Sequence, residues 1–184
     1  MVGAQNLYNF FMEHLIRLAT PNDAEALSAV MRQTFWDTYH TFNTLSDMTS
    51  YMKKSYSIAQ QTAEINDVSI ANIILENGGE IVAFAQILEK PADKPQIIPL
   101  NSAMLARFYL TEALKGKGFA AELLEACLAE TAKRGYNYLW LTVWQNNPRA
   151  IRFYEKQGFE TIGTTVFTLG SDEQTDWLML KKTQ

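Results

Sequence analysis

The segment around Asn77, Gly78 and Gly79 constrains the fold of this chain more than any other. Two runs rich in β-branched and other apolar residues, VSIANIILE and EIVAFAQILE, lie on either side of it. Because asparagine and glycine tolerate the positive φ angles of a tight turn, this arrangement predicts a β-hairpin. The fold must therefore contain at least one pair of antiparallel strands, to which the other elements are added.

Helical and strand-like segments alternate on both sides of this hairpin. Before it, HLIRLAT predicts a strand, and Thr20 is expected to cap a helix that extends to about Trp36. Ser46 is expected to cap a second helical region in two pieces. After the hairpin, the proline-rich stretch 90–102 predicts a surface loop, and AMLARFYL predicts a further strand.

The C-terminal half contains two further predicted helices. Apolar residues recur at helical spacing from Phe119 until Gly135, and Asn147 followed by proline opens the second helix. YLWLTVW lies between them, and two closing strands are joined by the acidic turn GSDEQT. The sequence thus predicts one mixed α/β domain over residues 13–184, after an N-terminal extension at 1–12. Its central twisted sheet is expected to be largely antiparallel, with about seven strands and about four flanking helices.

Composition narrows the partners of such a domain. The 184 residues carry 16 basic and 20 acidic side chains, and a net charge of −4 gives no long-range attraction for nucleic acid or an anionic membrane. A small molecule is the expected partner. The single cysteine, Cys127, permits no internal disulfide, which favours a cytoplasmic location. His14 and His40 have no partner at metal-ligand spacing, so no metal site is expected.

The segment KGKGFAAELL places two glycines directly before the predicted helix at Phe119. A helix N-terminus presents about four unpaired amide groups and roughly half a positive charge, and glycines allow these amides to close on an anionic oxygen. Lys115 and Lys117 add positive charge, so the loop predicts a phosphate site, with a plain strand-to-helix turn as the alternative. The spacing matches neither a P-loop nor the dinucleotide-binding fingerprint.

Two motifs resemble those of the GNAT acetyltransferase superfamily. The first is its coenzyme loop Arg/Gln-x-x-Gly-x-Gly/Ala, which residues 115–120 match apart from lysine at the first position. The second is Asn-x-x-Ala-x-x-x-Tyr-x-x-x-Gly-Phe, which NNPRAIRFYEKQGF matches. The resemblance runs from about Leu15 to the C-terminus. It implies the GNAT fold, acetyl-coenzyme A as cosubstrate and direct transfer of the acetyl group to an amine.

The resemblance also implies roles for individual residues. Backbone groups of one strand would pair with the pantetheine arm like an added strand, and the loop amides would hold the diphosphate. Tyr154 would protonate the departing thiolate, and Asn147 would bond the coenzyme or cap its helix. The expected coenzyme-binding residues are Phe108, Tyr109, Leu110, Lys115, Gly116, Lys117, Gly118, Phe119, Ala120, Asn147 and Tyr154.

The tail TVFTLGSDEQTDWLM is similar to that of the bacterial PaiA-type spermidine and spermine N-acetyltransferases, which implies a polyamine acceptor. Such chains carry acids on the strand before the loop, where this sequence has Met104 and Ala106. The sequence therefore leaves the general base unassigned. The candidate acceptor-site residues are Trp36, Asp37, Glu89 and Asp176.

Two alternatives to a polyamine acetyltransferase stay open at this point. The first keeps the chemistry but takes a protein or peptide N-terminus or a lysine as the acceptor. The second is a module that senses acetyl-coenzyme A without turnover. The exposed edge strands of the predicted sheet are compatible with a homodimer.

Overall fold

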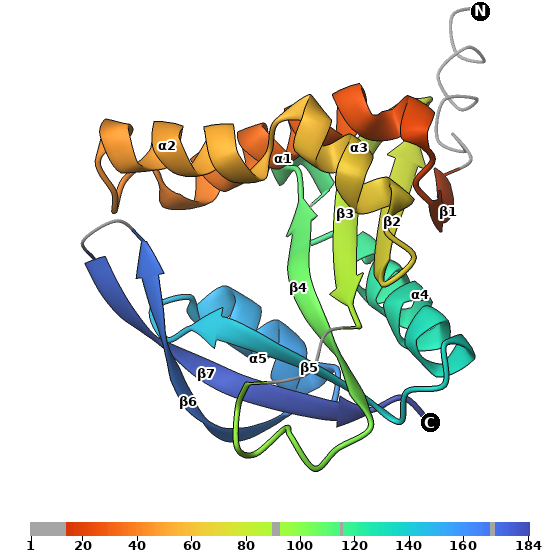
Figure 1. Ribbon diagram of the computed structural model, residues 1–184, viewed down its shortest axis with the longest axis vertical. Helices are drawn as coiled ribbons and strands as arrows, with labels where there is room; N and C mark the ends of the chain where they lie inside the picture. The colour runs from red at the N-terminus through yellow and green to blue at the C-terminus, as the bar shows by residue number, and fades with distance from the viewer. Residues whose placement is uncertain (1–13, 90–92, 115, 170–171) are drawn as a thin grey trace, which may run out of the picture.

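The structure, a computed structural model, describes residues 14–89, 93–114, 116–169 and 172–184 (Figure 1). The proposed extension at 1–12 lies outside these residues. The strands are β1 (His14–Leu18), β2 (Ile70–Asn77), β3 (Glu80–Leu88), β4 (Ser102–Leu110), β5 (Tyr138–Trp144), β6 (Glu160–Leu169) and β7 (Asp172–Lys182). The α-helices are α1 (Ala24–Tyr39), α2 (Leu45–Ser55), α3 (Ile58–Asn66), α4 (Phe119–Lys133) and α5 (Pro148–Lys156).

The seven strands form one sheet in the order β1-β2-β3-β4-β5-β7-β6. Every neighbouring pair is antiparallel except β4 and β5. The β2–β3 hairpin confirms the prediction from the sequence, and it turns through Gly78 and Gly79 at φ angles of 64° and 84°. Side chains with a Cβ atom rarely adopt such angles, which is why the turn uses two glycines.

The sheet opens between β4 and β5, where only the first three residues of each strand pair. Ser102–Met104 lie beside Tyr138–Trp140, and among the described residues the two strands share no later pairing. Beyond this point β4 stays with β3, while β5 stays with β7 (Figure 1). The register of β3 and β4 also shifts so that Ala106 has no partner on β3, and such a bulge bends its strand. The two halves of the sheet therefore diverge.

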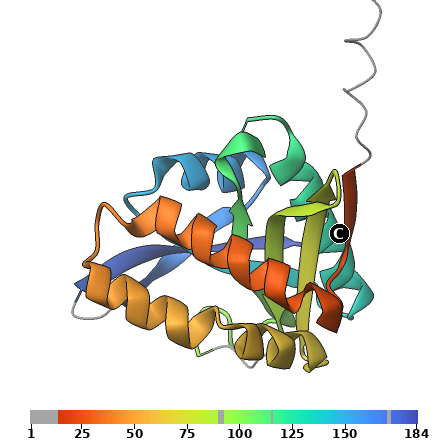
Figure 2. The same ribbon diagram turned by 90° about the horizontal axis from the view of Figure 1, so that it is seen from above.

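Helices cover both faces of this sheet. On one face, α4 and α5 bury apolar residues such as Leu123 and Leu124 against β2 to β5. On the other face, α1 lies over β3 and α3 over β2, while α2 lies beside α1 (Figure 2). Met31 of α1 and Met48 of α2 belong to the same buried apolar cluster on this face. Of the described helices, none is both long enough and apolar enough to cross a membrane.

Five α-helices are present in the described part of the chain, and the region after Ser46 divides into α2 and α3, in agreement with the two pieces expected from the sequence. Two details differ from the sequence-based predictions. Thr44 caps α2, not Ser46, because the Thr44 side chain accepts a hydrogen bond from the amide of Asp47. The residues expected in the acidic turn from Asp172 onward belong to β7, whose register with β6 begins at Asp172.

Cys127 is fully buried on the inner face of α4, in agreement with its position in the apolar pattern. Burial also raises the pKa of its thiol well above the usual range, so the reactive thiolate is scarce. We expect the native protein to react with a thiol-specific reagent orders of magnitude more slowly than the urea-unfolded protein. The two rates are measured by colour release, and equal rates would contradict the buried position.

Candidate functional site

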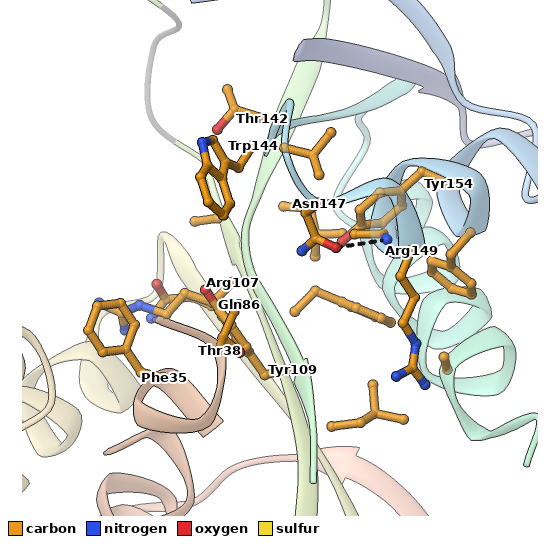
Figure 3. Close-up of a pocket in the computed structure, with 18 of the residues that line it drawn as sticks. Phe35, Thr38, Gln86, Arg107, Tyr109, Thr142, Trp144, Asn147, Arg149 and Tyr154 are labelled. Carbon is orange, nitrogen blue, oxygen red and sulfur yellow. Dashed lines mark hydrogen bonds between the residues drawn. The ribbon is translucent and has the colours of Figure 1, made fainter. Parts of the chain in front are cut away.

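A cavity of about 780 Å³ lies where β4 and β5 separate (Figure 3). One part, the helix-side arm, is lined from α4, α5 and the loop before α4. Its residues include Gly116, Gly118, Ala120, Asn147, Arg149, Phe153, Tyr154 and Lys156. The other part, the aromatic arm, is lined from the α1 and α2 side of the sheet. Its residues include Phe35, Thr38, Tyr39, Tyr51, Tyr56, Gln86, Arg107, Tyr109, Thr142, Trp144, Gln174 and Asp176.

The cavity reaches both faces of the sheet because successive side chains of β4 point to opposite faces. Phe108 packs against Phe153 of α5, with ring centroids 5.8 Å apart. Its neighbour Tyr109 stacks on Phe84 toward α1, with centroids 5.5 Å apart. Figure 3 shows the result, with Tyr154 and Arg149 on one side of β4 and Phe35 and Thr38 on the other. The divergence of β4 and β5 joins the two arms into one cavity.

The N-terminus of α4 meets the helix-side arm through two glycines. Gly116 and Gly118 have φ angles of 81° and 95°, and a Cβ atom added at either position would meet no atom within 4 Å. The positive φ angles, and not a shortage of space, therefore require glycine here. This conformation brings the first turn of α4 to the cavity, where Ala120 and Ala121 line the wall. The helix dipole then presents its positive end to any ligand in this arm.

The N-terminus of α5 lies on the opposite wall of the same arm. Asn147 caps the helix, as expected from the sequence, by accepting a hydrogen bond of 3.1 Å from the amide of Ala150 (Figure 3). Arg149 and Lys156 add two positive charges to the lining. Two helix N-termini and two basic side chains therefore make the helix-side arm suited to an anionic ligand.

Tyr154 lies in α5 where the helix-side arm reaches the opening between β4 and β5. Its side chain is 7% exposed, and its ring meets Phe108, Phe153 and Phe159 in tilted or edge-on contacts. Burial raises the pKa of the phenol above its usual value near 10. The hydroxyl therefore keeps its proton at neutral pH and is available as a proton donor.

The aromatic arm is walled by rings from four elements. Phe35 of α1 stacks on Tyr51 of α2, with centroids 4.7 Å apart. The hydroxyl groups of Tyr39 and Tyr109 lie 3.5 Å apart across the gap between α1 and β4. Burial raises the pKa values of Tyr39, Tyr56 and Tyr109, so these phenols are neutral. Neutral aromatic faces of this kind attract cations.

A buried polar network supports the floor of the aromatic arm. Arg107 of β4 donates to Glu64 of α3 over 2.6 Å, and Gln86 of β3 donates to the same carboxylate over 2.7 Å. Gln86 also donates to Asn72 of β2 over 3.0 Å. The guanidinium of Arg107 lies 5.1 Å from the centre of the Tyr56 ring. The charge of Arg107 is thus neutralised by Glu64 beneath the cavity wall.

The structure brings together many of the residues that the sequence motifs single out. Phe108, Tyr109, Leu110, Gly116, Gly118, Ala120, Asn147 and Tyr154 all line the cavity, and so does Asp176. Lys117 is exposed outside the cavity lining, and Phe119 packs edge-on against His14. Lys115 lies outside the described residues.

Three predicted acceptor-site residues lie away from the cavity. Trp36 stacks on His40 along α1, and Asp37 is exposed and accepts a hydrogen bond from Gln33. Neither lines the cavity: Asp37 faces solvent, and Trp36 packs against the margin of the apolar cluster that contains Phe35. Glu89 follows β3 and forms an ion pair with Arg134 beyond α4. Its carboxylate is therefore paired with Arg134 outside the cavity and does not face an acceptor there.

The sequence analysis missed most of the aromatic arm. Tyr51 lies in α2 and Tyr56 directly after it, a region that carries no motif, and only the fold brings them to the cavity. Arg149 was also missed, although it lies inside the NNPRAIRFYEKQGF motif and directly follows the capping residues. A basic residue in the first turn of a motif helix was the signal that could have found it. Within the described residues there is no cluster of three or more His, Cys, Asp or Glu side chains suited to a metal ion.

Comparisons with known proteins agree with this architecture. An uncharacterised N-acetyltransferase of Mycobacterium tuberculosis is 31% identical over 160 residues, which cover 87% of this chain and 97% of that protein. An uncharacterised N-acetyltransferase of Lactobacillus delbrueckii subsp. lactis is 28% identical over 159 residues, covering 86% and 91% of the two chains.

Among solved structures, the PaiA N-acetyltransferase of Thermoplasma acidophilum in complex with coenzyme A has a similar fold. It superposes with a TM-score of 0.77 at 24% identity, covering 93% of this chain and 99% of that one. The sequence model of the Acetyltransferase (GNAT) family matches residues 30–159. The extent of this match, together with the 31% identical relative, shows that the chain belongs to the GNAT family of acetyl-coenzyme A-dependent N-acetyltransferases.

Proposed function

We propose that this protein transfers the acetyl group of acetyl-coenzyme A to a primary amine of a small cationic acceptor, with spermidine and spermine as the first candidates. The observation that carries the proposal is the single cavity that joins an anion-binding arm to an aromatic arm at Tyr154. The sequence resemblance and the fold shared with a PaiA N-acetyltransferase support the polyamine candidates.

The helix-side arm suits the coenzyme. The amides at the start of α4 and the side chains of Arg149 and Lys156 would hold the diphosphate and other phosphate oxygens. From Leu105 onward β4 pairs with no residue of β5 among those described, so one edge of Phe108–Leu110 is free to pair with an extended ligand. The pantetheine arm carries amide groups that would bind this edge in the manner of an added strand.

The reaction is a direct attack of the amine on the thioester within a ternary complex. Holding both reactants across the opening between β4 and β5 makes the step effectively intramolecular. The free amide edge of β4 would polarise the thioester carbonyl, and Tyr154 would donate its proton to the departing sulfur. A primary amine with a pKa near 10.4 must first lose a proton, which costs about 4 to 5 kcal/mol at pH 7.

The aromatic arm suits a cationic acceptor. The faces of Tyr39, Tyr51 and Tyr56 would stabilise an ammonium group by cation–π attraction, by about 0.5 to 2 kcal/mol for each close ring. Arg107 does not oppose such a cation strongly because Glu64 neutralises it. A slender amine would fit this arm better than a bulky chain.

The proposal is tested by the release of coenzyme A, detected through its free thiol. Cys127 is the only cysteine in the sequence and is buried, so the native protein adds little background to the assay. Acceptors are spermidine, spermine, a series of aliphatic monoamines and a peptide with a free N-terminus. Saturable release with polyamines is expected. Release of coenzyme A with the peptide alone would indicate a protein or peptide acceptor in place of a polyamine. Binding of acetyl-coenzyme A without release for any amine would indicate a sensor module.

Substitution of Gly118 by alanine should weaken coenzyme binding. A non-glycine residue at φ 95° is strained by about 1 to 2 kcal/mol, and relaxation of that strain moves the first amides of α4. We expect the KM for acetyl-coenzyme A to rise roughly 5- to 30-fold. Gly135→Ala is the matched control, because Gly135 has a φ angle of 87° at the opposite end of α4. Equal KM values in the two variants would argue against the role of the loop.

A further inference from the structure

Asp176 is a buried carboxylate that faces the aromatic arm. It lies in β7 between Trp144 of β5 and Thr165 of β6, and its exposure is only 6%. It lines the cavity, and its Oδ1 atom has no hydrogen-bond partner among the described residues. Buried polar atoms in folded proteins are almost always paired, so an unpaired carboxylate oxygen beside a cavity requires an explanation.

The groups around Asp176 do not neutralise it. Tyr39 of α1, Tyr51 of α2, Tyr56 after α2 and Tyr109 of β4 are the phenols of this arm, and a neutral phenol supplies no positive charge. Asp176 itself acts on Tyr39, where its charge contributes to the raised pKa of the phenol. Arg107, the cation of this arm, is bound to Glu64. The two strands beside Asp176 contribute Thr142, Trp144 and Thr165, none of which carries a charge.

We propose that Asp176 binds the ammonium group of the acceptor in the aromatic arm and accepts its proton before acetyl transfer. This role rests on the proposed function. It also accounts for the absence of an acid at Met104 and Ala106 of β4, because β7 reaches the same cavity from the other side of the opening. The acceptor class that fits is a primary ammonium ion on an apolar stem, held between one carboxylate and several aromatic rings.

The acetyl transfer requires only the acceptor amine, the thioester, Asp176 and Tyr154. The ammonium group gives one proton to Asp176, and the neutral nitrogen forms a bond to the thioester carbon. The carbon–sulfur bond breaks with its electron pair on sulfur, and the sulfur takes the phenolic proton of Tyr154. The nitrogen then returns its second proton to Tyr154. Asp176 releases its proton to solvent, so the net products are the acetamide, coenzyme A and one proton.

The carboxylate is suited to this role by its burial. Burial raises the pKa of Asp176, while a hydrogen bond from Thr142 opposes the shift. A raised pKa makes the carboxylate a stronger base than an exposed aspartate, and it remains ionised above that pKa. The acidic limb of the pH profile of kcat/KM should therefore report the protonation of Asp176.

The test compares Asp176→Asn with Glu173→Gln, which removes a charge from an exposed position of the same strand. Asp176→Asn should lower kcat/KM for an aliphatic ammonium acceptor by about 100-fold or more and abolish the acidic limb of the profile. Trifluoroethylamine is largely neutral at assay pH and needs no base to remove a first proton. Its kcat/KM should therefore fall far less in Asp176→Asn than that of the aliphatic ammonium acceptor. Glu173→Gln should retain the wild-type rate. An equal loss for both amines, or an unchanged pH profile, would overturn this role.

A second readout separates catalysis from structural damage. Because the pKa of Asp176 is raised in the folded state, protonation stabilises the fold at low pH, and this stability is lost as pH rises through the folded pKa. Asparagine resembles the protonated form, so Asp176→Asn should raise Tm at neutral pH and not at acidic pH. A lowered Tm at neutral pH would identify the carboxylate as a structural group and overturn the proposal.

The two proposals fail in different ways in these experiments. Wild-type protein that releases no coenzyme A with any amine would overturn the acetyltransferase function, and the role of Asp176 with it. Wild-type turnover that Asp176→Asn leaves intact would overturn only the role of Asp176. Calorimetry of acetyl-coenzyme A binding to the variant should give the wild-type affinity, because Asp176 lines the aromatic arm.

Discussion

Replacing Tyr154 by phenylalanine should lower kcat by about 10²- to 10⁴-fold while acetyl-coenzyme A still binds. The variant keeps the ring and its contacts with Phe108, Phe153 and Phe159, so the cavity wall is preserved. It removes only the hydroxyl group that would protonate the sulfur. Single-turnover measurement of coenzyme A release, with calorimetry of coenzyme binding, tests the two halves of this expectation.

Tyr136→Phe is the matched control for this substitution. Tyr136 is partly buried and packs against the same apolar cluster as Tyr154, but its hydroxyl group donates to Glu89 at 3.3 Å, outside the cavity. We expect the control to retain the wild-type rate. The raised pKa of Tyr154 further predicts that the phenol produces no loss of rate up to about pH 10. A Tyr154→Phe variant with the wild-type rate across this range would remove Tyr154 from the mechanism.

The largest expected effect on stability comes from Arg107→Met. This variant leaves Glu64 buried and without its guanidinium partner, which typically costs about 3 to 5 kcal/mol. For a domain of this length we expect Tm to fall by roughly 6 to 20 °C. Urea and thermal unfolding measure the change. Arg107 also lines the cavity, so activity is not the readout here.

Two further variants give this stability prediction its controls. Lys133→Met removes an exposed cation from Glu130, which keeps Arg134 as its partner, and should change stability by less than about 1 kcal/mol. The double variant Arg107→Met with Glu64→Leu removes both buried charges and should recover part of the loss. A small effect of Arg107→Met alone would mean that water or another group pairs with Glu64 in the variant. The Arg107–Glu64 pair would then contribute little to the free energy of unfolding.

The parts of the fold that were predictable from the sequence are those that local chemistry specifies. The β2–β3 hairpin follows from two glycines that adopt positive φ angles between apolar runs. The start of α5 follows from Asn147, whose side chain caps the helix as asparagine before proline suggests. The cap of α2 was predicted at Ser46 but lies at Thr44, because threonine and serine are both typical capping residue types and the chain folds so that Thr44 accepts the hydrogen bond from the amide of Asp47.

The candidate site also has one part that was predictable from the sequence and one part that was not. The helix-side arm comes from two short motifs, in which neighbouring residues act together, so most of its lining could be listed from the sequence. The aromatic arm comes from Phe35, Tyr51, Tyr109 and Asp176, which lie far apart in the chain. Three of the four acceptor-site residues predicted from the sequence are outside the arm, since no local pattern shows which face of α1 meets the sheet.

The sequence by itself determined the hairpin, the cap of α5, the glycine loop and the order of strands and helices, because each depends on residues within a few positions of one another. Only the tertiary structure decided that β4 and β5 separate after three paired residues, since that depends on which neighbour each strand keeps. The burial of Asp176 also depends on the tertiary structure, because β7 is placed between Trp144 of β5 and Thr165 of β6 by strand pairing. No spacing along the chain records that its Oδ1 atom lies beside a cavity without a hydrogen-bond partner among the described residues.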